Sequence, residues 1–238
     1  MSWHCKSSGG YTTNTPVTRY PDADGIDNCI EIWNTLSARG WTANAVAGML
    51  TCAAFESGYN PWRWEADHIF QNSAAADADN YPGSYGYGLL QWTPASYMNA
   101  AYYAARGVRP NKYINNPHSI NLPGYGPNYI DTPGSTLDGR AQMIYLDTYG
   151  YVGSYYNSGG TYGNMEPTFA DFKASTRPAS DLCEVWVTNF ERPQDPSGNR
   201  PARQALAPLL YDLISGVPPT KALPIWLLFK MRENNFRR

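Results

Sequence analysis

Apolar residues recur with helical spacing through much of this 238-residue chain, and the clearest stretch runs from Trp41 to Pro61. Apolar side chains separated by three or four positions lie on one face of a helix and predict that this face is buried. The buried stripe predicted here consists of Val46, Met49, Leu50 and Ala53. The pattern therefore predicts one amphipathic helix, around which the rest of the domain is organised.

Polar residues at both ends of this stretch set the limits of the helix. Thr42 is a suitable N-cap, Gly58 suits the left-handed position after a helix, and Pro61 prevents the helix from resuming. Glu56 falls in the last turn, at the edge of the apolar face. Apolar neighbours and the negative helix end favour its protonated form, which a general acid needs. A glutamate at a helix end is, however, most often an ordinary solvated residue.

Further helical patterns alternate with irregular stretches. Helices are predicted over 26–39, 96–106, 137–151, 168–175, 180–190 and 203–215, while 60–85, 108–137 and 150–163 resemble loops, the last of them a flexible one. Alternating strand patterns are few. The predicted fold class is therefore mainly α, within the α+β range.

Composition divides the chain into three parts. Residues 1–25 are predicted to form an irregular arm, 26–215 a single domain, and 216–238 a tail. The tail holds the most apolar run of the chain, 223–229, followed by basic residues. This run either packs back on the domain, docks on a partner protein or contacts a membrane surface.

Charge and cysteine content exclude several classes of function. Only 16% of residues are charged and the net charge is −2, which argues against nucleic-acid binding. No apolar run is long enough to span a membrane, and no secretory signal is expected at the start. The four cysteines form no close pair, so we expect mostly free thiols and neither a metal nor a cofactor. A 14% aromatic content suits a protein that stacks rings on sugars.

A second stretch with chemical potential is 85–94, Tyr-Gly-Tyr-Gly-Leu-Leu-Gln-Trp-Thr-Pro. Its alternating glycines allow the backbone to bend sharply or approach a ligand, and Gln91 offers both a donor and an acceptor.

Four segments in this order carry a resemblance: 40–50 (Gly-Trp-Thr to Gly-Met-Leu), 55–61 (Phe-Glu-Ser-Gly-Tyr-Asn-Pro), 86–94, and 190–193 (Phe-Glu-Arg-Pro). Over roughly residues 26–215 the chain resembles the phage tail lysozyme family. The resemblance implies a lysozyme-like fold in which Glu56, at a helix C-terminus, faces a peptidoglycan cleft and protonates the glycosidic oxygen.

The resemblance also implies further site residues and a biological setting. The expected substrate-binding residues are Ser57, Tyr59, Tyr87, Gln91 and Trp92. Glu191 and Arg192 are expected to form a structural ion pair rather than to act in catalysis. The expected substrate is the glycan strand of the host wall. The resemblance does not explain residues 216–238, but their apolar run and the lack of an expected secretory signal favour a phage virion tail as the location, where this segment contacts other tail proteins.

The second carboxylate of a two-carboxylate glycosidase stays open at this point. Glu65, Asp67, Asp77 and Asp79 all lie in the loop that could reach across a cleft, and Asp67 is preferred because it is nearest the aromatic segment. The alternatives are a lytic transglycosylase that uses the same Glu56, a cell-wall peptidase, and a non-catalytic virion protein that keeps the fold. The scattered histidines and mid-helix Cys52 make both kinds of peptidase weaker candidates.

Overall fold

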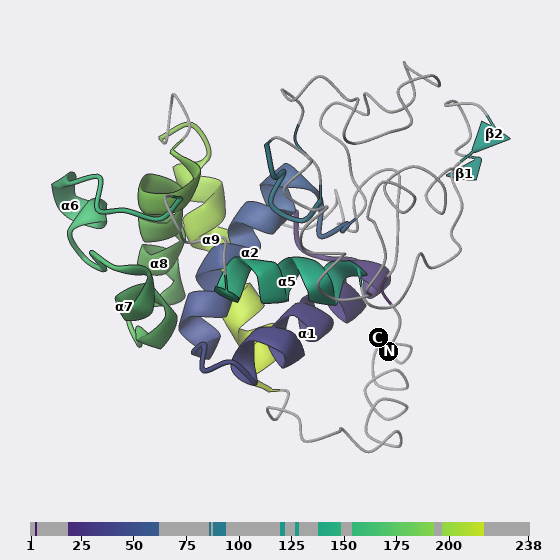
Figure 1. Cartoon of the computed structure of the whole chain (residues 1–238), viewed down its shortest axis with the longest axis horizontal. Coiled ribbons are helices and arrows are strands. Elements are labelled where there is room, and N and C mark those ends of the chain that lie inside the picture. The colour runs from purple at the N-terminus through teal and green to yellow at the C-terminus, as the bar shows by residue number, and fades with distance from the viewer. Residues whose placement is uncertain are drawn as a thin grey trace.

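The computed structural model describes residues 3, 19–61, 86, 88–93, 120–121, 127–128, 138–148, 154–192 and 197–216. These residues are mostly helical, which confirms the mainly α fold class (Figure 1). The helices are α1 (Ala23–Ser37), α2 (Ala43–Glu56), α5 (Asp138–Thr148), α6 (Gly160–Gly163), α7 (Phe169–Ala174), α8 (Ala179–Trp186) and α9 (Arg200–Ser215). The strands β1 (Ile120–Asn121) and β2 (Pro127–Asn128) form one short antiparallel pair. The predicted helix over 96–106 and the tail from 217 lie outside the described residues.

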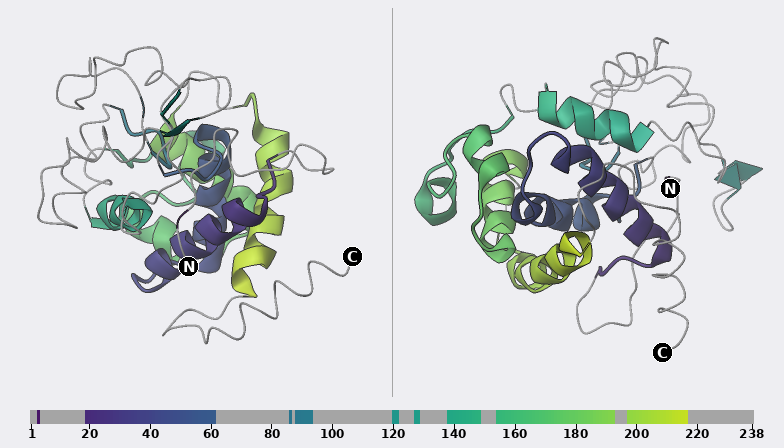
Figure 2. Two further views of the ribbon diagram at one scale, coloured as in Figure 1. Left: turned by 90° about the vertical axis from the view of Figure 1, so that its right-hand side faces the viewer. Right: turned by 90° about the horizontal axis from the view of Figure 1, so that it is seen from below.

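Helix α2 is the centre of the molecule. Its neighbours α1, α8 and α9 surround it, as the view from below shows (Figure 2), and α5 packs against α1. Every residue from Ala45 to Ala54 is buried, so the helix is not amphipathic as predicted but enclosed on all sides. Its many small residues explain this, because they allow neighbouring helices to approach from several directions.

The predicted limits of α2 are confirmed. The Thr42 side chain accepts a hydrogen bond from the Ala45 amide at 3.1 Å, and Gly58 takes a left-handed conformation with φ +61°. Glu56 is the last helical residue, and it is the one exposed residue in the otherwise buried or half-buried stretch 45–61.

Other predictions need correction. Helix α1 begins at Ala23 because Asp22 caps the amides of Asp24 and Gly25, so the helix starts within the predicted arm. The predicted flexible loop over 150–163 ends in α6, and its Tyr155 is buried.

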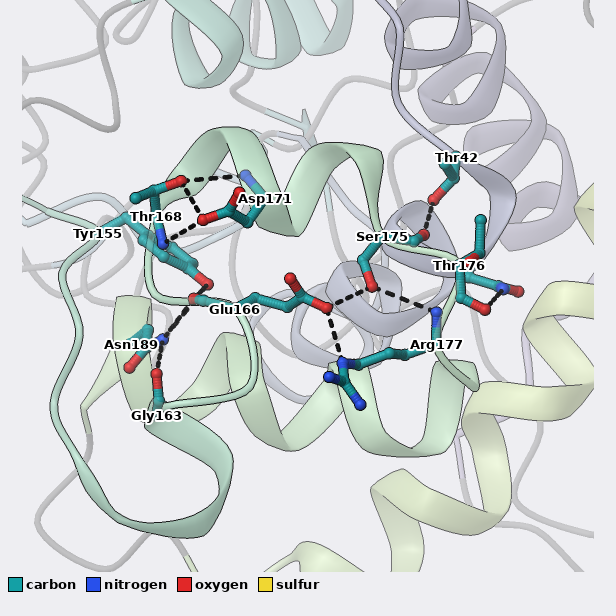
Figure 3. A network of polar contacts seen from close by, with 11 residues as sticks. Thr42, Tyr155, Gly163, Glu166, Thr168, Asp171, Ser175, Thr176, Arg177 and Asn189 are labelled. Atoms are coloured by element: carbon teal, nitrogen blue, oxygen red, sulfur yellow. Dashed lines mark hydrogen bonds and ion pairs between the residues drawn. The ribbon is translucent and has the colours of Figure 1, made fainter.

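A polar network secures α7 and α8 near the start of α2 (Figure 3). Thr42 donates to the Ser175 carbonyl at 2.5 Å, and the Glu166 carboxylate accepts from the Ser175 hydroxyl and the Arg177 guanidinium. The amide of buried Asn189 donates to the carbonyls of Gly163 and Glu166. This end of α2 is therefore fixed by satisfied polar groups.

Candidate active site

The candidate site is at the C-terminal end of α2, where Glu56 lies beside a second carboxyl group. Carboxyl oxygens of Glu56 and Glu191 and the Cys52 sulfur all lie within 4.8 Å of one another. Cys52 and Glu56 are one helical turn apart on α2, whereas Glu191 comes from the far end of the α8 segment. Long-range packing, and not sequence proximity, creates this cluster.

Two features of the sequence bring Glu191 to this position. Gly48 permits a close approach of α8 to α2, because a Cβ atom there would lie 2.9 Å from Leu182. The chain beyond α8 then widens into a π-helix over Val187–Glu191, which ends at Arg192 with a left-handed φ of +48°. Such π-helical insertions re-aim side chains and are frequent at functional sites.

The surroundings of Glu191 disfavour its charge. Burial, and next the charge of Glu56, raise the pKa of Glu191 to about 8, although hydrogen bonds from Cys52 and Trp186 oppose the rise. The Trp186 indole donates to Glu191 Oε1 at 3.4 Å and stacks on Phe190 with 4.3 Å between ring centroids. A carboxyl in such a setting keeps its proton near neutral pH.

The expected ion pair between Glu191 and Arg192 is wrong. Among the described residues, Arg192 instead donates to the carbonyls of Ser154 and Asn189, and its guanidinium lies 4.2 Å from the ring centroid of Tyr156. The left-handed turn at Arg192 explains this, since it directs the two side chains to different neighbours. The sequence did not predict that Glu191 lies beside Glu56. The Phe-Glu-Arg-Pro segment at 190–193 was the only feature of the sequence that pointed to Glu191.

Ser57 and Tyr59 lie inside the protein. Buried Ser57 donates to the carbonyls of Ala53 and Leu89, at 3.0 and 2.9 Å, and so ties the 88–93 turn to the end of α2. Tyr59, with φ +63°, donates through its hydroxyl to the Arg19 carbonyl and accepts from Asn28 at its own carbonyl. In this arrangement both residues support the backbone that carries Glu56.

The turn 88–93 has a similar internal role. Gln91, at φ +49°, donates to the Gly88 carbonyl at 3.0 Å. Trp92 is buried edge-on against Tyr145 and Phe190, with centroid distances of 5.5 and 5.8 Å. Trp92 thus links this turn to the π-helical segment that carries Glu191. Tyr87 and Asp67 lie outside the described residues, so their roles stay predictions.

Two residues that sequence reasoning missed hold the site together. Buried Gln142 of α5 accepts from the Leu89 amide at 2.9 Å and donates to the Pro61 carbonyl at 2.6 Å. Gly88 makes room for it, since a Cβ there would lie 2.5 Å from Gln142 Oε1. Arg19 donates to the carbonyls of Ala54 and Phe55, which places a cation at the negative end of α2.

The thiols at and near the site are protonated and free of disulfides. Cys29, Cys52 and Cys183 are all buried and free, as the sequence led us to expect for most thiols. Burial raises the pKa of Cys52 well above its ordinary value, and the charges of Glu191 and Glu56 raise it further. Although Cys52, Glu56 and Glu191 are close enough to share a metal ion, a protonated thiol is a poor ligand. The cluster suits proton chemistry better.

A helical domain with an exposed carboxyl at the end of its buried central helix is consistent with the mainly α, lysozyme-like class of fold. The phage tail lysozyme family matches residues 27–214, and the chain belongs to that family. Morphogenesis protein 1 of Bacillus phage B103 is 28% identical over 193 residues, which cover 79% of this chain and 40% of that relative. The chain thus spans less than half the length of that relative. Each helix that the structure describes is too short or too polar to span a lipid bilayer.

Proposed function

We propose that this protein is a lysozyme-type glycoside hydrolase that cuts the glycan strand of bacterial peptidoglycan, with Glu56 as its general acid. The observation that carries the proposal is the position of Glu56. It is the one exposed residue of the stretch 45–61, at the end of a buried helix, and it lies beside the carboxyl group of Glu191. Membership of the phage tail lysozyme family supplies the substrate class. A carboxylic acid so placed can protonate a glycosidic oxygen while remaining accessible to the substrate.

The second partner in the reaction has to reach the opposite face of the sugar. Glu191 is more buried than Glu56 and lies next to it, so it is not placed across a bound glycan. We therefore keep Asp67 as the candidate for activating water or stabilising the developing positive charge. Tyr87, Gln91 and Trp92 keep their proposed place in the sugar-binding region, with Trp92 contributing mainly through its packing.

The family and its relative also support a setting. We propose that the protein is part of a phage particle and opens the host wall locally, since the relative carries the name of a morphogenesis protein. Contact with other tail proteins through residues 216–238 belongs to this proposal. A cysteine peptidase is disfavoured because burial keeps Cys52 protonated and out of reach of a substrate.

Analysis of reaction products tests the proposal. Purified peptidoglycan is incubated with the wild type or with Glu56→Gln, and the fragments are identified by mass spectrometry. New reducing sugar ends that depend on Glu56 support a hydrolase, whereas anhydro ends indicate a transglycosylase and free amines a peptidase. The absence of any product from the wild type would favour a virion protein without turnover.

A further inference from the structure

Two glutamates of the α6–α8 region, Glu166 and Glu184, are buried, and a third, Glu191, is half-buried. Among the described residues, only Glu191 of these three lacks a cationic partner. Glu166 pairs with Arg177 at 2.9 Å, and Glu184 pairs with Arg200 and Arg203 at 2.9 and 3.0 Å. Glu191 faces the Glu56 carboxyl and the Cys52 thiol instead. Because unpaired buried charges are costly, Glu191 requires a different explanation.

We propose that Glu191 is a positioning residue for Glu56, and that the two carboxyl groups hold one proton between them, which keeps a proton available to Glu56 near neutral pH. This inference rests on the proposed role of Glu56 as general acid. The carboxyl oxygens are within 4.8 Å, so two negative charges there would repel each other strongly in a partly buried site. Such a pair loses its protons in two steps that belong to both groups.

The surrounding groups are consistent with one retained proton. From α2 come Cys52 and Glu56, and from the π-helical segment and its end come Glu191 and Arg192. Arg192 is engaged with backbone carbonyls, and its charge only weakly lowers the pKa of Glu191. On the α9 side, Arg203 acts on Cys52 from a distance but is bound by Glu184. Among the described residues, no cation is therefore paired with the Glu191 carboxyl.

The proton balance of the reaction follows from this arrangement. The Glu56 carboxyl gives its proton to the glycosidic oxygen as the bond between that oxygen and the anomeric carbon breaks. Water adds hydroxide to the anomeric carbon and releases its remaining proton on the opposite face of the sugar, and the carboxyl pair regains a proton from the solvent. Glu191 takes no part in bond breaking. Its effect is to raise the proton affinity of Glu56 through their proximity.

A pH–rate profile tests the inference. Release of reducing ends is measured between about pH 4 and pH 10 for the wild type, Glu191→Gln and Glu191→Asp. The neutral amide of Glu191→Gln removes the repulsion between the two carboxyl groups. The alkaline limb of its pH–rate profile therefore moves to lower pH by at least about one unit, and at a fixed pH on that limb the rate falls about tenfold. Glu191→Asp, which keeps a carboxyl, gives an intermediate limb. Asp181→Asn removes a carboxylate from the opposite end of α8 and leaves the wild-type profile unchanged.

The outcomes separate this inference from the proposed function. If Glu191→Gln is folded and keeps the wild-type alkaline limb, Glu191 is merely structural and the inference is overturned. If Glu56→Gln is as active as the wild type, the proposed function fails first. Should Glu191→Gln not fold, carbon-13 NMR of carboxyl-labelled glutamates in the wild type decides without an activity assay. One glutamate of the wild type must have a pKa well above the ordinary value of about 4.3, and this pKa must fall in Glu56→Gln. If no glutamate behaves in this way, the inference is overturned.

Discussion

Glu184 and Glu191 lie seven residues apart on one continuous helical segment, yet their surroundings are opposite. The Glu184 side chain is fully buried, and the guanidinium groups of Arg200 and Arg203 both bind its carboxylate. Glu191 is enclosed by Trp186, Cys52 and Glu56, none of which carries a positive charge. Two turns of helix therefore separate Glu184, whose charge is paired with two arginines, from Glu191, whose surroundings disfavour the charged form.

This difference indicates which acid has a structural role and which a chemical one. The Glu184 carboxylate accepts hydrogen bonds from two guanidiniums of α9, so its role is to hold two helices together. A carboxyl beside another carboxyl retains its proton and can influence the proton on its neighbour. Glu184 joins α8 to α9, whereas Glu191 conditions the exposed end of α2. The two residues can be compared directly by substitution.

The largest expected effect comes from Glu184→Gln. This change leaves Arg203, whose side chain is only 6% exposed, without its carboxylate. We expect the free energy of unfolding to fall by about 3–5 kcal/mol, because the substitution breaks a buried ion pair by removing one of its partners. Urea unfolding at pH 6 measures this, with Glu191→Gln as the matched control that costs no more than about 1 kcal/mol. Equal losses for the two variants would remove the distinction between them.

The next effect is a pH dependence of stability that Glu191 causes. The pKa of Glu191 is about 8 in the folded protein and near its ordinary value of 4.5 after unfolding. Within this window the folded state binds more protons, so stability falls as pH rises, by on the order of 4 kcal/mol in total. Urea unfolding at intervals between pH 5 and pH 9 follows the decline. It is expected to flatten in Glu191→Gln, and a wild-type slope in that variant contradicts the assignment.

A smaller loss is expected when a neutral buried side chain is removed. Gln142→Leu leaves the Leu89 amide and the Pro61 carbonyl without this partner, which costs about 3 kcal/mol or somewhat less. Unlike Glu191→Gln, this variant should lose the same stability at every pH. Gln204→Leu, which removes a partly buried bond to Tyr162, serves as the control and should cost under about 1 kcal/mol. Similar values for both would show that Gln142 does not hold the turn.

The smallest effect concerns the cation at the end of α2. Arg19→Gln weakens the hydrogen bonds to the carbonyls of Ala54 and Phe55 and removes charge from the negative helix end. We expect a loss of about 1 kcal/mol that shrinks at high salt, since Arg19 is only half-buried and salt screens its charge in part. Thermal unfolding at low and high salt measures it. Exposed Arg140 provides a matched Arg→Gln control on α5.

Local patterns predicted α1, α2, α5, α7, α8 and α9, because caps and apolar spacing are local properties, but they missed the short α6. Thr42, Gly58 and the terminal position of Glu56 are all placed as the sequence indicates. The interior roles of Ser57, Tyr59 and Trp92 were not evident, since residues of these types suit a sugar-binding surface equally well. Their burial follows from helices that meet far apart in the sequence.

The partner of Glu56 shows most clearly where local reasoning ends. Glu191 lies 135 positions along the chain from Glu56, and its place depends on the close contact at Gly48 and on a π-helical turn. Gln142 and Arg19 also reach the site through long-range hydrogen bonds that have no sequence signature. Periodicity predicts which faces are buried but not which side chains meet.

The rate at which Glu56→Gln releases reducing ends from purified peptidoglycan decides whether Glu56 is the general acid. The amide keeps the shape of the side chain but has no acidic proton, so the rate should fall by at least about a hundredfold at the wild-type optimum. Urea unfolding of the variant is measured alongside, so that a lower rate is assigned to Glu56 only in a folded protein. A folded Glu56→Gln protein that releases reducing ends at the wild-type rate would contradict the account.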